Sequence, residues 1–326
     1  MRSLKRSPKP VSDVGYLRSV ALMGTVVTIH VVGRGATQET IRYAAGSTRA
    51  RYPREEAVER AFEWFRRIEE CCTRFEAGSE LRQLSAQVGV PVPVSAILYE
   101  AVQFALAVAE ESGGAFDPTV GYAMETRGFN REYRTGQAVG TGIEPGGPVS
   151  YRDVRLDPGQ RTITLLRPLI LDLGAIAKGL AIDLAARELR PFENFAIDAG
   201  GDLYLGGCSP DGQPWAIGIR HPRRDNALID SLRVSNRAVC TSGDYERPSP
   251  VEGHHILDPR VGTSPCAVVS VTVVAPTAML ADALATAAFV LGPAEGIRLF
   301  DRLGVDGLIV SPELERHATR GMSSAC

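Results

Sequence analysis

Lysine is nearly absent from this chain of 326 residues. Only Lys5, Lys9 and Lys178 are lysines among the 36 basic residues, so arginine supplies the other 33. A compact ammonium and a planar guanidinium differ in reach, hydration and hydrogen-bonding geometry, so a site shaped for one rarely accepts the other. Lys178 therefore either has a chemical purpose or survives by chance in a biased composition, and the count alone does not separate these interpretations.

Net charge and long apolar runs are missing as well. The 36 basic residues nearly balance 38 acidic ones without a block of one sign, so composition gives no reason to expect nucleic acid or a membrane surface as a partner. No apolar run suits a membrane span, and the basic N-terminus lacks the apolar segment of a signal peptide. The six cysteines form no C-x-x-C and show no metal-ligand spacing, which favours a reducing compartment. We expect a cytoplasmic protein.

Strands in runs, interrupted by helices at irregular intervals, predict an α+β fold. Helices are expected over residues 55–75, 95–112, 174–189, 276–291 and 294–303. Strands are expected over residues 23–32, 162–173, 195–198, 202–207, 215–219, 232–235, 237–242, 267–275 and 307–311. Residues 121–159 are rich in glycine and polar residues and predict a loop. We expect a single domain over residues 17–312, with flexible tails at 1–16 and 313–326.

Asp282 and Thr286 are four residues apart on an expected helix, so their side chains share one face. Oxygen ligands suit a hard cation such as Mg²⁺, which commonly takes its other ligands from water and substrate phosphates. The competing interpretation is structural, because an early helical Asp complements the helix dipole and a helical Thr often bonds to the preceding turn. We expect the Asp282 carboxylate to lie on the helix surface.

Three glycine-rich segments could approach a ligand closely. The segment GAFDPTVG (114–121) contains a turn-prone Asp-Pro and small residues around Phe116, and IDAGGDLY (197–204) and CTSGDYE (240–246) place glycine beside carboxylate or hydroxyl groups. None matches the P-loop or the dinucleotide-binding fingerprint. Each is equally compatible with an ordinary turn.

The segment HHILDPRVG (254–262) places His255 and Asp258 near a proline-bounded turn. Histidine moves protons readily near neutral pH, so His255 is a candidate general base with Asp258 as its support. A structural or surface histidine is the alternative, and His254 is expected to face solvent. A Ser-His-Asp hydrolase is disfavoured because the chain lacks a G-x-S-x-G elbow.

In order, eight segments resemble the ApbE-like family, the FAD:protein FMN transferases. They are MGT (23–25), FEAGSELRQL (75–84), GGAFDPTVG (113–121), DLGAIAKGLAID (172–183), AGGDLYLGG (199–207), TSGDYER (241–247), HILDPRVG (255–262) and DALATA (282–287). The resemblance covers about residues 21–311, and its order makes coincidence implausible. It implies an α+β fold similar to a duplicated T-fold, with mixed and antiparallel sheets flanked by helices.

The resemblance also implies a Mg²⁺-dependent transferase. Such an enzyme cleaves FAD, attaches the FMN moiety through a phosphoester bond to a Ser or Thr in the flavinylation motif of an acceptor protein, and releases AMP. Two alternatives are an FAD pyrophosphatase, which would use the same residues to give FMN and AMP, and a non-catalytic FAD-binding or carrier protein.

Site residues follow from the same resemblance. It implies FAD contacts at Met23, Phe75, Ala115, Phe116, Asp117, Asp172, Lys178 and Ile256. It implies metal ligands at Asp282, Thr286 and the backbone carbonyl of Ala175, and a catalytic role for His255. A cation and an ammonium near a diphosphate stabilise the negative charge that develops as AMP leaves. This role would give Lys178 a chemical purpose.

Overall fold

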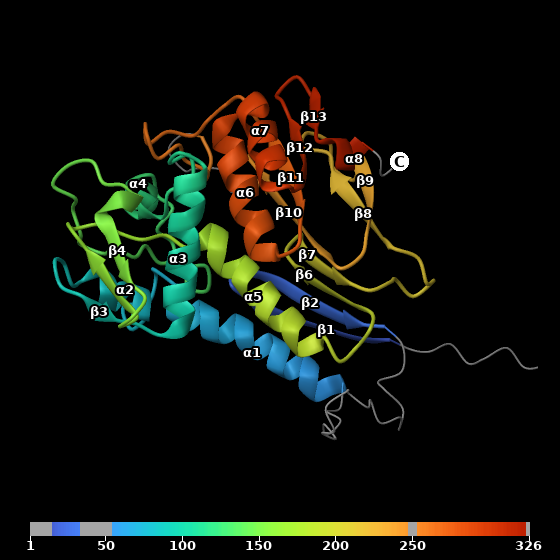
Figure 1. Ribbon diagram of the computed structural model, residues 1–326, viewed down its shortest axis with the longest axis horizontal. Coiled ribbons are helices and arrows are strands. Elements are labelled where there is room, and N and C mark those ends of the chain that lie inside the picture. Colours follow the sequence, from blue (N-terminus) through green and yellow to red (C-terminus); the bar gives the residue numbers. More distant parts are fainter. Residues whose placement is uncertain (1–14, 33–53, 247–252, 324–326) are drawn as a thin grey trace, which may run out of the picture.

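The computed structural model describes residues 15–32, 54–246 and 253–323. One antiparallel sheet has eight strands in the order β1-β2-β6-β7-β10-β11-β12-β13 (Figure 1). These strands are β1 (Tyr16–Leu22), β2 (Thr25–Val31), β6 (Phe195–Ala199), β7 (Asp202–Gly206), β10 (Arg237–Gly243), β11 (Ser270–Ala275), β12 (Asp306–Val310) and β13 (Arg316–Ala318). The sheet provides the platform on which the rest of the chain packs.

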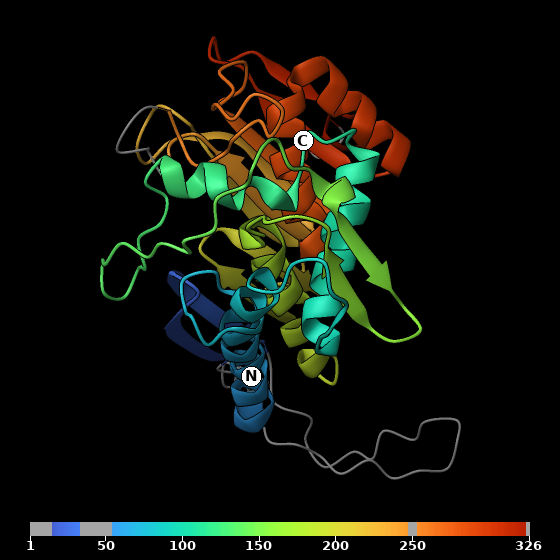
Figure 2. The ribbon, with the colours of Figure 1, turned by 90° about the vertical axis from the view of Figure 1, so that its left-hand side faces the viewer.

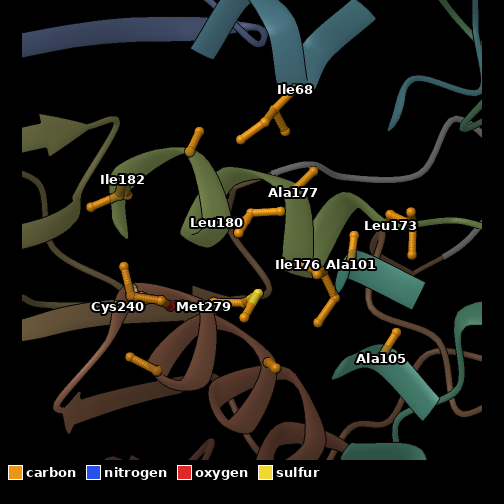
Figure 3. Close-up of a cluster of buried hydrophobic side chains, with 14 of the residues drawn as sticks. Ile68, Ala101, Ala105, Leu173, Ile176, Ala177, Leu180, Ile182, Cys240 and Met279 are labelled. Carbon is orange, nitrogen blue, oxygen red and sulfur yellow. Dashed lines mark hydrogen bonds between the residues drawn. The ribbon is translucent and has the colours of Figure 1, made fainter. Parts of the chain in front are cut away.

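Four helices cover one face of this sheet (Figure 1). They are α1 (Arg54–Cys72), α5 (Gly174–Leu189), α6 (Ala278–Leu291) and α7 (Pro293–Leu303). The sequence of α5 is apolar on nearly every side, as suits a helix surrounded by protein. Figure 3 shows α5 side chains reaching Ile68 of α1, Ala101 and Ala105 of a further helix, and Met279 of α6. α5 is therefore the central helix of the molecule.

A hairpin packs on the opposite face of the sheet. It consists of β8 (Trp215–Arg220) and β9 (Leu228–Val234), which pair antiparallel. Trp215 and Leu232 from this hairpin form a second hydrophobic cluster with Leu205, Val239 and Leu308 of the sheet. Both faces of the central strands are thus buried.

Most of the remaining elements form a smaller lobe, which faces the viewer in Figure 2. It contains α2 (Glu80–Ser85), α3 (Ala96–Glu111), α4 (Gly121–Thr126), the short helices η1 (Pro118–Val120) and η2 (Tyr151–Asp153), and the strands β3 (Val92–Pro93), β4 (Val154–Asp157) and β5 (Thr162–Leu165). Ser95 caps α3 by accepting a hydrogen bond from the Leu98 N–H. α3 contacts α1, α5 and α6, so it joins this lobe to the helical layer.

The predicted α+β class is confirmed, and three local expectations need correction. β1 was not expected, and it forms because a tight turn pairs it with β2. The expected loop over residues 121–159 contains α4 and β4, and β4 is stabilised by pairing with β5. Residues 316–318 of the expected tail form β13 on β12, and Met322 of the short helix α8 (Arg320–Ser323) is buried in the second cluster.

The expected boundaries of the domain, residues 17–312, stay a prediction. Residues 1–14 of the expected N-terminal tail lie outside the described residues, and Tyr16 already belongs to β1. Within residues 15–32, 54–246 and 253–323, no helix combines the length and apolar character needed to cross a bilayer.

Candidate active site

Two hairpin turns meet at one end of the large sheet. β2 and β6 are antiparallel neighbours, so the turn that precedes β2 lies beside the turn that follows β6. A Cβ on Gly200, in the second turn, would stand 2.2 Å from Thr25 Oγ1. The motif segments MGT and AGGD are therefore side by side, although they are far apart in the sequence.

Met23 adopts a backbone conformation that is unusual for its residue type. With Gly24 it forms the two-residue turn between β1 and β2, and the φ angles are 51° and 75°. Positive φ at both positions defines the turn that matches strand twist, and asparagine or glycine normally occupies it. A non-glycine residue held there costs about 1–3 kcal/mol, and such residues cluster at functional sites. This is consistent with the predicted FAD contact.

Lys178 of α5 forms an ion pair with Asp202, the first residue of β7. The Lys178 side chain is 29% exposed and that of Asp202 is 3% exposed, so the pair is largely removed from water. Asp202 Oδ1 also accepts a hydrogen bond from the Thr241 N–H at 3.2 Å, which ties the pair to β10. Buried carboxylates need such partners because desolvation disfavours their charge.

The Lys178 ammonium also lies in the field of Asp282 on α6. Burial lowers the pKa of Lys178, but Asp202 and Asp282 together raise it by more, so the pKa lies above its ordinary value. The ammonium therefore stays charged between carboxylates from two chain-distant elements. This arrangement favours a chemical purpose for Lys178 over chance.

Asp183 fixes the start of α6. Its Oδ1 accepts a hydrogen bond from the Ala278 N–H at 2.7 Å, and its Oδ2 accepts one from the Met279 N–H at 3.0 Å. Burial raises the pKa of Asp183 to about 6, although these two donors act in the opposite direction. The carboxylate satisfies donors that a helix cannot satisfy internally, and it positions Asp282 one turn later.

The expected metal ligands on α6 lie where that helix meets α5 and β10. Thr286 Oγ1 is 3.4 Å from Ser242 Oγ of β10. Asp282 is 7% exposed, so the expectation of a surface carboxylate was wrong. The reason is that α5 and the sheet pack around α6 on nearly all sides. Ala175 lies in the first turn of α5, one turn before Lys178.

The GAFDPTVG segment is held by Asp117. Asp117 Oδ1 accepts hydrogen bonds from the N–H and hydroxyl of Thr119 at 2.9 and 2.7 Å, and Oδ2 accepts one from the Tyr151 N–H at 2.8 Å. Burial raises the pKa of Asp117, opposed by these bonds. Ala115 and Phe116 are 1% and 5% exposed. These three residues therefore shape the segment from inside, and their predicted FAD contacts stay predictions.

Asp172 connects this segment to the start of α5. Its backbone N–H donates to the Pro118 carbonyl at 2.7 Å, and its Oδ1 accepts from the Gly174 N–H at 2.8 Å. The other Asp172 oxygen, Oδ2, accepts a hydrogen bond from Nε of Arg74 at 2.6 Å, and nothing in the sequence pattern singles out this arginine. Arg74 precedes Phe75, and its guanidinium lies 4.4 Å from the centre of that ring. A single arginine in an arginine-rich chain gives no signal before the fold is known.

The two adjacent histidines are arranged opposite to expectation. His254 is 7% exposed and packs edge-on against Phe289, with the two ring centroids 5.2 Å apart. Its Nε2 lies 3.1 Å from the Pro265 carbonyl oxygen. Its Nδ1 accepts the Ile256 N–H at 3.3 Å, which leaves Nε2 as the donor to Pro265. The expectation that His254 faces solvent was therefore wrong, because α6 supplies an aromatic neighbour. His255 is partly exposed, and its ring meets Phe129 edge-on at 6.5 Å.

Asp258 has a partner other than His255. Its Oδ1 accepts from the Arg260 N–H and Nε at 3.0 and 2.8 Å, and its Oδ2 accepts from Nη2 at 2.7 Å. Hydrogen bonds from the Arg260 side chain lower the pKa of Asp258. These bonds close the turn, and the predicted support of His255 by Asp258 stays a prediction. Ile256, another predicted FAD contact, is 4% exposed.

Fold and site together define an α+β protein with a polar, largely buried cluster where two helices meet the strand ends of an antiparallel sheet. Residues 23–309 match the ApbE family. The chain therefore belongs to the ApbE family.

Relatives and solved structures agree with this assignment. A protein of Treponema pallidum named FAD:protein FMN transferase is 31% identical over 335 residues, which cover 94% of this chain and 87% of the relative. A Vibrio cholerae protein of the same name is 32% identical and covers 68% of each chain. The crystal structure of the ApbE protein from Thermotoga maritima matches with a TM-score of 0.80 and 31% identity, covering 96% of this chain and 99% of that one.

Proposed function

We propose that this chain is a FAD:protein FMN transferase. The observation that carries the proposal is the similarity, along 94% of the chain, to a relative of that name. The predicted enzyme class is confirmed by several such relatives at about 30% identity. In this function FAD is the substrate and a second protein is the acceptor.

The proposed reaction is a displacement at phosphorus. The hydroxyl oxygen of an acceptor Ser or Thr attacks the phosphorus of the FMN half, the bond from that phosphorus to the bridging oxygen breaks, and AMP leaves. The hydroxyl proton passes to His255, which is partly exposed and can reach an incoming chain. The Lys178 ammonium, kept charged by Asp202 and Asp282, would stabilise the diphosphate as its charge moves.

A Mg²⁺ ion would be held by Asp282, Thr286 and the carbonyl of Ala175. Within the described parts of the chain, no three His, Cys, Asp or Glu residues gather into a metal site. The expected set has one carboxylate, one hydroxyl and one carbonyl, and such an all-oxygen set leaves positions for water and substrate phosphates, as Mg²⁺ prefers. The placement of Asp282 and Thr286 beside α5 and β10 fits this set. Bound there, Mg²⁺ would neutralise charge on the diphosphate.

Co-expression tests the transfer directly. The chain is expressed with candidate acceptor proteins, and mass spectrometry searches for FMN added to Ser or Thr. We expect modified acceptor only with the active chain. Purified protein is then incubated with FAD and Mg²⁺, with and without the acceptor. Rapid formation of free FMN without acceptor would favour the pyrophosphatase, and intact FAD after prolonged incubation with acceptor would favour a carrier.

Asp282→Asn tests the metal assignment in the same assay. We expect AMP release to fall about 100-fold or more, because one neutral amide replaces the carboxylate ligand. Asp301→Asn, an exposed change on α7, is the matched control and should behave as wild type. Unchanged, Mg²⁺-dependent activity in Asp282→Asn would remove Asp282 from the metal site.

A further inference from the structure

Arg74 contacts three parts of the site at once. It follows α1, and it is 5% exposed. Its Nε donates to Asp172 Oδ2 at 2.6 Å, its Nη2 donates to the Phe129 carbonyl, and its guanidinium lies 4.4 Å from the centre of the Phe75 ring. The side chain therefore joins the end of α1, the start of α5 and the loop after α4.

Two of these contacts are with Asp172 and Phe75, which are both expected to contact FAD. The other Asp172 oxygen accepts from the Gly174 N–H at 2.8 Å, so Arg74 orients the carboxylate that begins α5. Phe75 is partly exposed, and the guanidinium covers one face of its ring. A planar ligand would therefore stack on the opposite face, with the ring held in place by the cation.

The third contact is with Phe129, a neighbour of His255, which is proposed to take the proton of the acceptor hydroxyl. Arg74 holds the backbone of Phe129, and the Phe129 ring meets His255 edge-on, with centroids 6.5 Å apart and an interplanar angle of 69°. Phe129 belongs to none of the motif segments. One guanidinium thus fixes residues that border both reactants.

Burial of the Arg74 guanidinium has an unfavourable desolvation free energy. Its Nη1 is buried and has no hydrogen-bond partner among the described residues. A buried cation with an unused donor destabilises a fold relative to a well-packed apolar side chain. A side chain that only filled space at this position would not need a charge. The positive charge of Arg74 therefore indicates a role in the candidate site.

We propose that Arg74 is a positioning residue of the transfer reaction. It fixes Phe75 and Asp172 for FAD and, through Phe129, the ring of His255. This inference rests on the proposed function.

The test compares Arg74→Met, Arg74→Lys and the control Arg67→Met. Arg67 also lies over an aromatic ring, that of Trp64 at 4.6 Å, but it is exposed on α1. FAD affinity is measured by quenching of flavin fluorescence, and AMP release is measured at saturating FAD with Mg²⁺ and the acceptor found by co-expression. We expect Arg74→Met to weaken FAD binding and to slow AMP release at saturation, each by about tenfold or more. Arg74→Lys should recover part of the affinity, and Arg67→Met should change neither value.

The outcomes are separable. Wild-type values in Arg74→Met would overturn the inference, and a weaker affinity with an unchanged saturated rate would overturn the link to His255. If circular dichroism shows that Arg74→Met does not fold, Arg74→Lys becomes the deciding variant. Wild-type affinity and rate in Arg74→Lys would overturn the positioning role of the Arg74 guanidinium. Wild-type protein that neither binds FAD nor releases AMP would instead reject the proposed function.

Discussion

Gly179 of α5 lies directly against the backbone of Met279 of α6, where a Cβ on the glycine would stand 2.4 Å from the Met279 Cα. This contact allows the two helices to approach closely. It brings Lys178, the preceding residue, close enough to Asp282 for that carboxylate to raise the pKa of the lysine. The polar site therefore depends on an apolar approach of two backbones.

Gly179→Ala should separate α5 from α6. Alanine is the better helix former by about 1 kcal/mol, but the clash is with backbone, which no change of rotamer relieves. We expect a net loss of about 1–3 kcal/mol in the free energy of unfolding and a large loss of AMP release. Gly78→Ala is the control, because a Cβ there meets nothing within 4 Å. Urea unfolding that shows a more stable Gly179→Ala would contradict the close approach.

Lys178→Met should destabilise the fold through Asp202. Asp202 is 3% exposed at its side chain, and it would be left as a buried charge without its ion-pair partner. We expect a loss of about 3–5 kcal/mol in the free energy of unfolding. The double variant Lys178→Met/Asp202→Asn should recover most of that stability without recovering AMP release.

A double-mutant cycle measures this coupling. If the two changes add without interaction, the ion pair contributes nothing and the arrangement described for Asp202 is wrong. Lys178→Arg examines the choice of lysine itself: a planar guanidinium in the space of an ammonium should lower FAD affinity or rate. A fully active Lys178→Arg would return the lysine to chance.

His255→Gln and His254→Gln should fail in different ways. His255→Gln should lower AMP release about 10²–10⁴-fold, because the proton acceptor is lost, with little change in FAD affinity. His254→Gln should instead lower the free energy of unfolding by about 1–3 kcal/mol, because a buried side chain with a hydrogen bond to Pro265 is replaced. Fluorescence titration and chemical unfolding distinguish them. An equal loss of binding and rate in His255→Gln would place that residue in the ligand pocket instead.

Asp183 should make stability depend on pH. Its pKa is raised from 3.8 to about 6 in the folded protein, so the folded state binds the proton more tightly than the unfolded state. Its stabilising contribution is therefore complete below 3.8 and is lost as pH rises through about 6. Relative to Asp183→Asn, wild type should lose up to about 3 kcal/mol across that window. A difference between wild type and Asp183→Asn that stays flat with pH would contradict this.

The sequence predicts the five long helices and most strands, because their patterns are local. The apolar spacing of α1 and the buried character of α5 follow from residues close to one another in the chain. β1 and β13 were missed because these segments become strands only by pairing with a neighbouring strand. Pattern alone cannot supply that neighbour.

The residues of the candidate site likewise include some that the sequence predicts and some that only tertiary contacts reveal. Motif order identified Lys178 and Asp282, but not the Asp202 carboxylate that holds the lysine, which comes from a strand that follows α5. His254 and His255 are adjacent in the sequence, and the buried one is distinguished by tertiary contacts with Phe289 of α6 and with Pro265. Arg74 could not be recognised among 33 arginines, since its importance lies in contacts to residues 55 and 98 positions away.

The cap on α6 has a consequence for how the protein assembles. The first two N–H groups of that helix bond to the Asp183 carboxylate, 95 and 96 residues earlier in the chain. The opening turn of the segment that carries Asp282 and Thr286 is therefore held in place by α5. The position of the oxygen donors expected to hold a cation is thus set by tertiary packing and not by a local motif alone.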